Sequence, residues 1–366
     1  MNSIASFPAG WRNAACLISA LFCLPVAAEN YPLPAAGSDV IGEIAYSNAD
    51  KEDTLLDIAR RFSLGQDEIV LANRQVDRWY PGAGTQVLLP KMFVLPNVPR
   101  TGIVLNVPEM RLFYFRRQGK QGPTDVVTYP VSIGRMDWKT PRGTTSIVQK
   151  LVDPPWRPPE TIKKEHAANG DFLPDVVPPG PNNPLGRFAM KLGIPGYLIH
   201  GTGIDKAFGI GMRVTHGCVR MYPEDVEQLF PLVPVGSPVH ITNEPIKVGW
   251  LGQDMYIEVH PPLKEDFLDF KEHPPQEDEE QDHLVHAPLE EGSPDYQRLL
   301  SIALDLIQKK VGKNAPPQIN PQALKAAVKE MSGVPVLIAQ PAPLPVAPPE
   351  AETDTALPAS LVEPWH

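Results

Sequence analysis

The residues that could carry chemistry in this 366-residue chain concentrate in one glycine-rich stretch, residues 197–220. Cys218 lies two residues after His216 and eighteen after His200, and five of the twenty residues 200–219 are glycine. A thiol is a poor nucleophile at its free pKa of ~8.5. A neighbouring imidazole can take the proton of the thiol or stabilise the thiolate as an ion pair. The stretch therefore predicts attack of a thiolate on a carbonyl, giving a tetrahedral oxyanion and then a thioester.

Other groups near the thiol are placed to assist. His216 and Cys218, at positions i and i+2 of an extended segment, are expected to share one face. His200 ends a predicted strand and could approach from a neighbouring one. The backbone N–H groups of Gly217 and Cys218 are candidate oxyanion donors. Two alternatives stay open, namely a buried cysteine among structural histidines and a metal site.

The N-terminus has the pattern of a signal peptide. Arg12 precedes the apolar run Ala14–Leu24, and the small residues Val26-Ala27-Ala28 offer a cleavage site. The run is shorter than the ~20 residues that span a bilayer, although an uncleaved anchor is the alternative. We expect residues 1–28 to be removed and the mature protein to be exported, with no integral membrane segment.

Cleavage would also decide the cysteine count. It would remove Cys16 and Cys23 and leave Cys218 as the one thiol. A lone thiol in an exported protein forms no internal disulfide and is accidental, intermolecular or reactive. Zinc needs three or four Cys or His ligands, and no further cysteine remains. We therefore expect no metal and no cofactor.

Two folded units are predicted before the C-terminal third. Residues 44–90 have a βααβ pattern, with an amphipathic stripe at Leu55, Ile58, Ala59 and Phe62. Residues 100–243 predict a mainly β catalytic domain with one packed helix. Its predicted strands include a hairpin over 102–115 and later runs at 126–133, 144–152, 186–192, 197–200 and 239–242. The helix begins at Pro223 and is stopped by Pro231 and Pro234.

A proline-rich segment interrupts this β domain. Residues 153–185 contain nine prolines. A long loop inside a compact domain is unusual, and it is often an active-site lid or disordered. We expect this segment to act as a lid.

The C-terminal third predicts an extension, residues 244–340, with an acidic linker and helices that begin at Ser293-Pro294 and Asn320-Pro321. Residues 341–366 are rich in proline and alanine and predict a disordered tail. Residues 261–296 hold twelve acidic and two basic residues, which account for the whole net charge of −10. With no basic face elsewhere, nucleic acid is not an expected partner.

Several motifs together resemble the L,D-transpeptidase (YkuD-like) family. The matching residues are Ile199-His200-Gly201-Thr202 and Thr215-His216-Gly217-Cys218-Val219-Arg220. Residues 178–186 are similar to the ErfK/YbiS-type enterobacterial subgroup, which carries an N-terminal LysM module. Residues 44–90 themselves resemble a LysM module, a type that binds N-acetylglucosamine-containing glycans; a packing domain that binds nothing is the alternative.

The resemblance implies a β-sandwich catalytic domain in the periplasm, with Cys218 as nucleophile and His200 as general acid/base. Arg220 would bind a substrate carboxylate or form a structural ion pair. His216, replaced by Gln in some relatives, would be a helper in substrate binding together with Gly217.

The implied reaction joins peptidoglycan stems to an amine. Cys218 would attack meso-diaminopimelate of a tetrapeptide stem and release D-Ala. The acceptor would be the C-terminal lysine of an outer-membrane lipoprotein, which the subgroup resemblance favours, or a second diaminopimelate, giving a 3→3 crosslink. Water as acceptor would make the enzyme an L,D-carboxypeptidase. The alternative from another class is a wall-binding anchor protein with an inactive transpeptidase-like domain.

Overall fold

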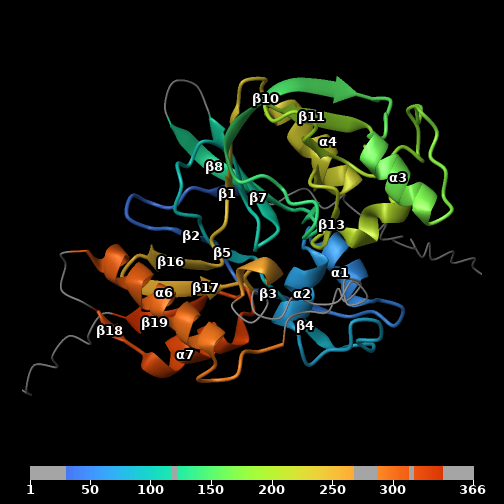
Figure 1. Cartoon of the computed structure of the whole chain (residues 1–366). Coiled ribbons are helices and arrows are strands. Elements are labelled where there is room, and N and C mark those ends of the chain that lie inside the picture. The colour runs from blue at the N-terminus through green and yellow to red at the C-terminus, as the bar shows by residue number, and fades with distance from the viewer. Residues whose placement is uncertain (1–29, 118–121, 268–286, 313–316, 341–366) are drawn as a thin grey trace, which may run out of the picture.

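The computed structural model describes residues 30–117, 122–267, 287–312 and 317–340 (Figure 1). The predicted signal peptide, the acidic stretch 268–286 and the proline-rich tail 341–366 lie outside the described residues. In the part of the chain that is described, no helix combines the length and the apolar character needed to cross a bilayer.

A nine-stranded sheet forms the catalytic domain, in the order β1-β8-β7-β6-β15-β10-β11-β12-β14. Its strands are β1 (Asn30–Pro32), β6 (Gly102–Asn106), β7 (Arg111–Arg117), β8 (Pro123–Pro130), β10 (Gly143–Val152), β11 (Phe188–Leu192), β12 (Leu198–His200), β14 (Val219–Arg220) and β15 (Pro238–Thr242). The β15–β6 and β12–β14 pairs are parallel, and the other neighbours are antiparallel. A separate parallel pair joins β9 (Ile133–Gly134) to β13 (Arg213–Thr215).

Strand β10 is where this sheet changes direction. Its first half pairs with β15 and its second half with β11, with an irregular register between Ile147 and Gln149. Side chains from both arms share one apolar core, which also takes Val226 and Leu229 of helix α4 (Pro223–Leu232). The mainly β domain with a packed helix is thus confirmed. It is one continuous bent sheet, and α4 runs through Pro231, where the sequence predicted a stop.

The proline-rich segment 153–185 contains a helix that the sequence did not predict. Helix α3 (Glu160–Ala168) begins directly after Pro159, which serves as its N-cap residue. A preceding proline suits a helix start because its fixed φ is compatible with the first turn. The segment is therefore an ordered excursion from the sheet, as Figure 1 shows beside β11.

The N-terminal unit has the predicted βααβ order: β3 (Ala45–Asn48), α1 (Leu55–Arg61), α2 (Gln66–Ala72) and β4 (Gln86–Leu89). Thr54 caps α1 in a capping box with Asp57. The predicted stripe is buried at Leu55, Ile58 and Ala59 in a core of its own. A short pair that the sequence did not predict, β2 (Val40–Gly42) with β5 (Met92–Val94), flanks this unit.

This unit packs on the catalytic domain just ahead of the cysteine motif. The backbone N–H groups of Gln66 and Asp67 donate to the carbonyls of Ile210 and Gly211, at 2.9 and 3.3 Å. A Cβ on Gly211 would lie 2.4 Å from the Gly65 Cα, so the approach requires glycine. The contact holds a loop that leads directly into β13 and the catalytic motif.

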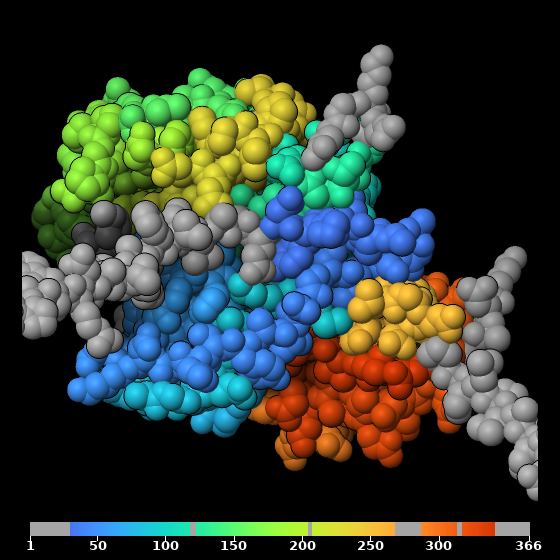
Figure 2. Space-filling view, turned by 180° about the vertical axis from the view of Figure 1, so that it is seen from behind, coloured from blue at the N-terminus to red at the C-terminus, as the bar shows by residue number. Residues whose placement is uncertain are grey.

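The C-terminal extension is a folded module. A four-stranded sheet, β16 (Ile246–Leu251), β17 (Asp254–Val259), β19 (Val336–Gln340) and β18 (Gln318–Ile319), packs with α6 (Pro294–Val311) and α7 (Pro321–Glu330) around a second core. The sequence predicted both helices, which start after the caps Ser293 and Asn320, but not this sheet. Two short 3-10 helices, η1 (Ile204–Gly209) and η2 (Lys264–Asp266), complete the described elements. Figure 2 shows the N-terminal unit and this module side by side beneath the catalytic domain.

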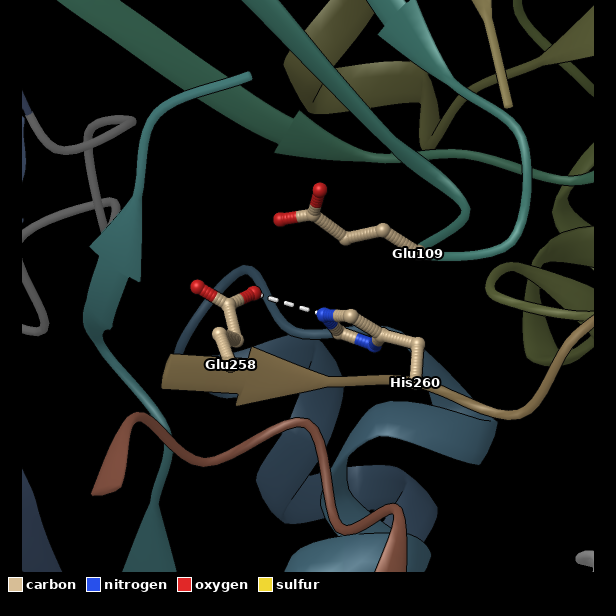
Figure 3. A group of neighbouring side chains, drawn as sticks. All are labelled: Glu109, Glu258 and His260. Atoms are coloured by element: carbon tan, nitrogen blue, oxygen red, sulfur yellow. Dashed lines mark hydrogen bonds and ion pairs between the residues drawn. The ribbon is translucent and has the colours of Figure 1, made fainter. Parts of the chain in front are cut away.

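A buried ionic cluster joins the module to the catalytic domain. The Lys247 ammonium of β16 lies 2.7 Å from a carboxylate oxygen of Glu109, at the tip of the β6–β7 hairpin, and 2.8 Å from Glu258 of β17. His260 completes the cluster through a 2.6 Å contact with Glu258 (Figure 3). Buried charges need such compensation, because removing one partner leaves the other unpaired at a cost of about 3–5 kcal/mol.

Candidate active site

The parallel pairing of β12 with β14 brings the predicted catalytic residues together. Ile199 lies opposite Val219, and His200 opposite Arg220. Cys218 comes immediately before β14. His200, His216, Cys218 and Arg220 all line one cavity of about 740 Å³. Segments about twenty residues apart in the chain thus share one site.

His200 is held in the orientation of a base. Its ring is buried, and Nδ1 lies 2.6 Å from the backbone carbonyl of Gly201. A carbonyl only accepts, so Nδ1 carries the proton and Nε2 has the free lone pair. Burial and, to a smaller extent, the positive charge of Arg220 outweigh the opposing Gly201 hydrogen bond and lower the pKa of His200 to about 3. His200 is therefore neutral at physiological pH.

The Cys218 thiol is also neutral at rest. Burial raises the pKa of Cys218, although a backbone hydrogen bond with Leu198 and the Arg220 charge lower it in part. The thiol also lies 3.7 Å from the carbonyl oxygen of Gly196. The sequence left open whether the imidazole stabilises a preformed thiolate or takes the proton of the thiol during the reaction. Because the pKa of His200 is lowered and that of Cys218 is raised, proton transfer during the reaction is favoured over a preformed ion pair.

Gly217 allows a turn of the backbone next to Cys218. Its φ is +94°, so residues 216–218 are not the extended segment that the sequence predicted. A Cβ here would lie 2.6 Å from Tyr197 Cε1, which excludes other residues. Its backbone N–H donates to Thr215 Oγ1 at 3.2 Å, and its carbonyl accepts from Thr140 Oγ1 at 2.9 Å. The Gly217 N–H is thus already engaged, contrary to the expectation of an oxyanion donor.

His216 lies in the same cavity but faces a partner that the sequence did not reveal. Its Nε2 lies 2.8 Å from Oε2 of Glu165, on helix α3. The Trp138 ring packs edge-on against the His216 ring, with centroids 5.1 Å apart. Glu165 escaped detection because α3 itself was unpredicted; the run Glu160–Ala168 is free of proline and was the available signal.

Arg220 lines the cavity, and its guanidinium has no carboxylate partner among the described residues. Among the described residues it makes no ion pair, and its Nε is buried with no hydrogen-bond partner. Burial lowers the pKa of Arg220, and Cys218 raises it in part. A desolvated cation that lines a cavity favours an anionic ligand. This arrangement argues against the structural ion pair that the sequence left open.

Residues 153–185 build much of the cavity wall. The residues from this segment are Asp153, Pro154, Pro155, Trp156, Arg157, Pro159, Ile162, Pro184 and Leu185. The rest of the lining comes from β10, β11, β12 and the loop before it, from Trp138 and from residues of the stretch 215–220. The segment therefore lines the same cavity as the thiol, and its role as a lid stays a prediction.

A possible metal site lies elsewhere, in the cluster that joins the C-terminal module to the catalytic domain. Glu109, Glu258 and His260 offer ligand atoms within 4.8 Å of one another (Figure 3). The Lys247 ammonium, however, contacts both carboxylates and supplies the positive charge there. The cluster is consistent with an internal ion network.

Comparisons with known proteins agree on one family. The profile of the L,D-transpeptidase catalytic domain matches residues 100–241. Probable L,D-transpeptidase YcfS of Escherichia coli is 39% identical over 252 residues, covering 67% of this chain and 77% of that protein. Probable L,D-transpeptidase YbiS of the same strain is 38% identical over 254 residues, covering 68% and 81%. Probable L,D-transpeptidase ErfK/SrfK of Salmonella typhimurium is 37% identical over 248 residues, covering 67% and 78%.

The electrostatics of the thiol can be tested by alkylation. We expect the rate of Cys218 alkylation by iodoacetamide to rise with pH through a midpoint above the ~8.5 of a free cysteine peptide. Replacing Arg220 by Met removes a positive charge that stabilises the thiolate, so the midpoint should move higher still. A Lys309→Met variant, which removes an exposed charge on α6, is the control. A reactive plateau below pH 7 would reveal an ion pair and contradict the neutral resting state.

Proposed function

The chain belongs to the L,D-transpeptidase family, and from that premise we propose that it is a peptidoglycan L,D-transpeptidase acting through Cys218. The observation that carries the proposal is the pairing of β12 with β14. It sets a thiol and a neutral imidazole with a free Nε2 in one cavity. This combination can generate a nucleophile at the moment of attack.

In the proposed acylation, Cys218 Sγ attacks the carbonyl carbon of meso-diaminopimelate, the third residue of a tetrapeptide stem. Nε2 of His200 takes the thiol proton as the C–S bond forms. The tetrahedral intermediate then collapses, the C–N bond to D-Ala breaks, and His200 returns the proton to the leaving amine. A thioester and free D-Ala result. The Gly201 carbonyl supports this cycle because it stabilises the transient imidazolium through Nδ1–H.

In the second step an amine attacks the thioester, and the thiol is regenerated. The two candidate amines are the C-terminal lysine of an outer-membrane lipoprotein and the side-chain amine of a second diaminopimelate. The similarity to the YcfS, YbiS and ErfK group is compatible with either. Attack by water would release a tripeptide, the L,D-carboxypeptidase alternative.

The charge of the cavity supports an anionic peptide as substrate. Arg157, Lys191 and Arg220 line it, whereas Asp153 is the one acidic residue in its lining. A stem peptide carries several carboxylates. We propose that Arg220, the most buried of the three cations, binds a carboxylate close to the reacting carbonyl.

The N-terminal unit has a surface suited to a glycan. Trp79 and Tyr80, in the loop between α2 and β4, are 52% and 85% exposed, and Tyr46 on β3 is 58% exposed. Exposed aromatic rings offer flat apolar faces on which sugar rings pack. We propose that this LysM-like unit binds peptidoglycan glycan in the periplasm. Docked beside the catalytic domain, it would raise the local concentration of stems.

The rival function is a wall-binding anchor with an inactive catalytic domain. Slow alkylation of the resting thiol is compatible with both functions, because a thiol activated during attack is also protonated at rest. Turnover separates them. An anchor has no need for a buried imidazole whose tautomer is fixed, and this favours the enzyme.

The decisive experiment replaces the thiol. A Cys218→Ala protein should keep its fold, checked by circular dichroism, and lose release of D-Ala from disaccharide-tetrapeptide, with at least a ~10³-fold fall in rate. Cys218→Ser is the isosteric partner variant. Unchanged turnover in Cys218→Ala would refute the assignment.

Muropeptide mass spectrometry of a deletion strain identifies the acceptor. Loss of stems that carry a lipoprotein remnant would assign the lysine acceptor, and loss of 3→3 dimers would assign diaminopimelate. The Cys218→Ala gene should fail to restore either product.

The glycan proposal is tested on the exposed rings. We expect a Trp79→Ala, Tyr80→Ala double variant to bind isolated peptidoglycan about tenfold more weakly, since each ring contributes roughly 0.5–1 kcal/mol. Turnover of a small soluble stem should stay unchanged. A Val235→Ala, Leu304→Ala double variant, which removes two other exposed apolar side chains outside the cavity, is the matched control. Equal binding of the two proteins in a co-sedimentation assay would contradict a glycan role.

A further inference from the structure

We propose that Glu165 is a positioning residue that fastens helix α3 over the Cys218 cavity and so protects the acyl-enzyme from water. The inference rests on the proposed function, because it concerns the thioester formed in that reaction. It adds a residue that lies outside the cysteine motif and on a helix absent from the sequence prediction.

One carboxylate makes both connections. Oε1 of Glu165 accepts from the guanidinium of Arg135 at 2.9 Å, and Oε2 lies 2.8 Å from Nε2 of His216. Arg135 directly follows β9, and His216 is two residues before Cys218. The carboxylate therefore bridges the lid to two segments of the catalytic core, one of which carries the nucleophile.

The base of the lid is held independently. Trp156 and Val177 exchange backbone hydrogen bonds of 2.9 and 2.8 Å. The buried Asn183 donates to the Pro154 carbonyl at 2.9 Å and accepts from the Leu185 N–H at 2.9 Å. These bonds close the two ends of the segment on each other, but they do not fix the direction in which α3 projects.

The far end of the lid depends on Glu165. Lys163 pairs with Glu160 and Asp175, and His166 with Asp171, all within the segment itself. Among the described residues, every side-chain hydrogen bond or ion pair from α3 to the chain outside 153–185 ends on Glu165.

We call the Glu165 carboxylate with its contacts to Arg135 and His216 the latch. The latch also sets which face of α3 meets the cavity. Ile162, three residues before Glu165, lies on the same helical face, is buried and lines the cavity. Burial raises the pKa of Glu165. The hydrogen bonds from His216 and Arg135 outweigh this effect of burial and leave the pKa of Glu165 below its usual value. The carboxylate is therefore ionised at neutral pH.

This geometry bears on how the thioester is consumed. Attack by an amine forms an amide and attack by water forms a carboxylic acid; both break the same C–S bond and return the thiol. Water is always abundant, so amide formation requires that the site restrict it. A lid that swings away should let water reach the thioester and should orient the acceptor less well.

The test measures how the acyl group divides between amine and water. The full-length protein is given disaccharide-tetrapeptide, which also serves as diaminopimelate acceptor, together with a peptide that ends in lysine. Mass spectrometry quantifies the tripeptide acid against both amide products. The variants are Glu165→Ala and Glu165→Gln, with Glu160→Gln as control, since it removes an exposed carboxylate of the same helix that pairs inside the lid.

We expect Glu165→Ala to raise the acid-to-amide ratio about tenfold, less than the ~100-fold that a 1 Å misplacement can cost. Glu165→Gln keeps an acceptor oxygen and should fall between, and Glu160→Gln should match the wild type. Amide exchange at residues 160–168 should be faster in Glu165→Ala alone. A merely structural role would lower total turnover without moving the ratio.

The outcomes separate the two proposals. If the wild type turns over but Glu165→Ala leaves the ratio and the exchange of α3 unchanged, the latch is overturned and the transpeptidase assignment stands. A wild type that yields tripeptide alone also overturns the latch, because the lid then protects nothing. If the wild type and Cys218→Ala are equally inert, the proposed function itself fails.

Discussion

The parallel contact between β12 and β14 is the constraint on which the site depends. It sets His200 opposite Arg220 and the thiol of Cys218 one step earlier on the same edge. The carbonyl of Gly201, the next residue in the chain, then fixes the imidazole tautomer. An imidazole, a thiol and a guanidinium are thereby brought to one edge by backbone geometry.

Burial at this edge sets the protonation states of His200 and Cys218. It lowers the pKa of His200 and raises that of Cys218, so neither group is charged before substrate arrives. Arg220 remains the cation of this edge, and it favours the thiolate and any bound carboxylate alike. A thiol that is protonated at rest is also less susceptible to oxidation, because the thiolate is the reactive form.

The peripheral parts of the chain support the same edge from several sides. The N-terminal unit bonds to Ile210 and Gly211, which lead into the cysteine motif. Segment 153–185 reaches His216 through Glu165. The C-terminal module is locked to the β6–β7 hairpin through the buried Lys247. The N-terminal unit and the C-terminal module each have an apolar core of their own, so these contacts position folded units against the catalytic domain.

Local signals in the sequence determined much of this protein. Capping residues and apolar stripes located α1, α4, α6 and α7, and the spacing of His200 and Cys218 marked them as the candidate catalytic pair. Contacts between distant segments decided the rest: the bend at β10, the β16–β17 hairpin in the C-terminal sheet, the contacts of helix α3 with Arg135 and His216, and the protonation states of His200 and Cys218. Register across strands, burial and partner charge depend on residues far apart in the chain, and no local pattern encodes them.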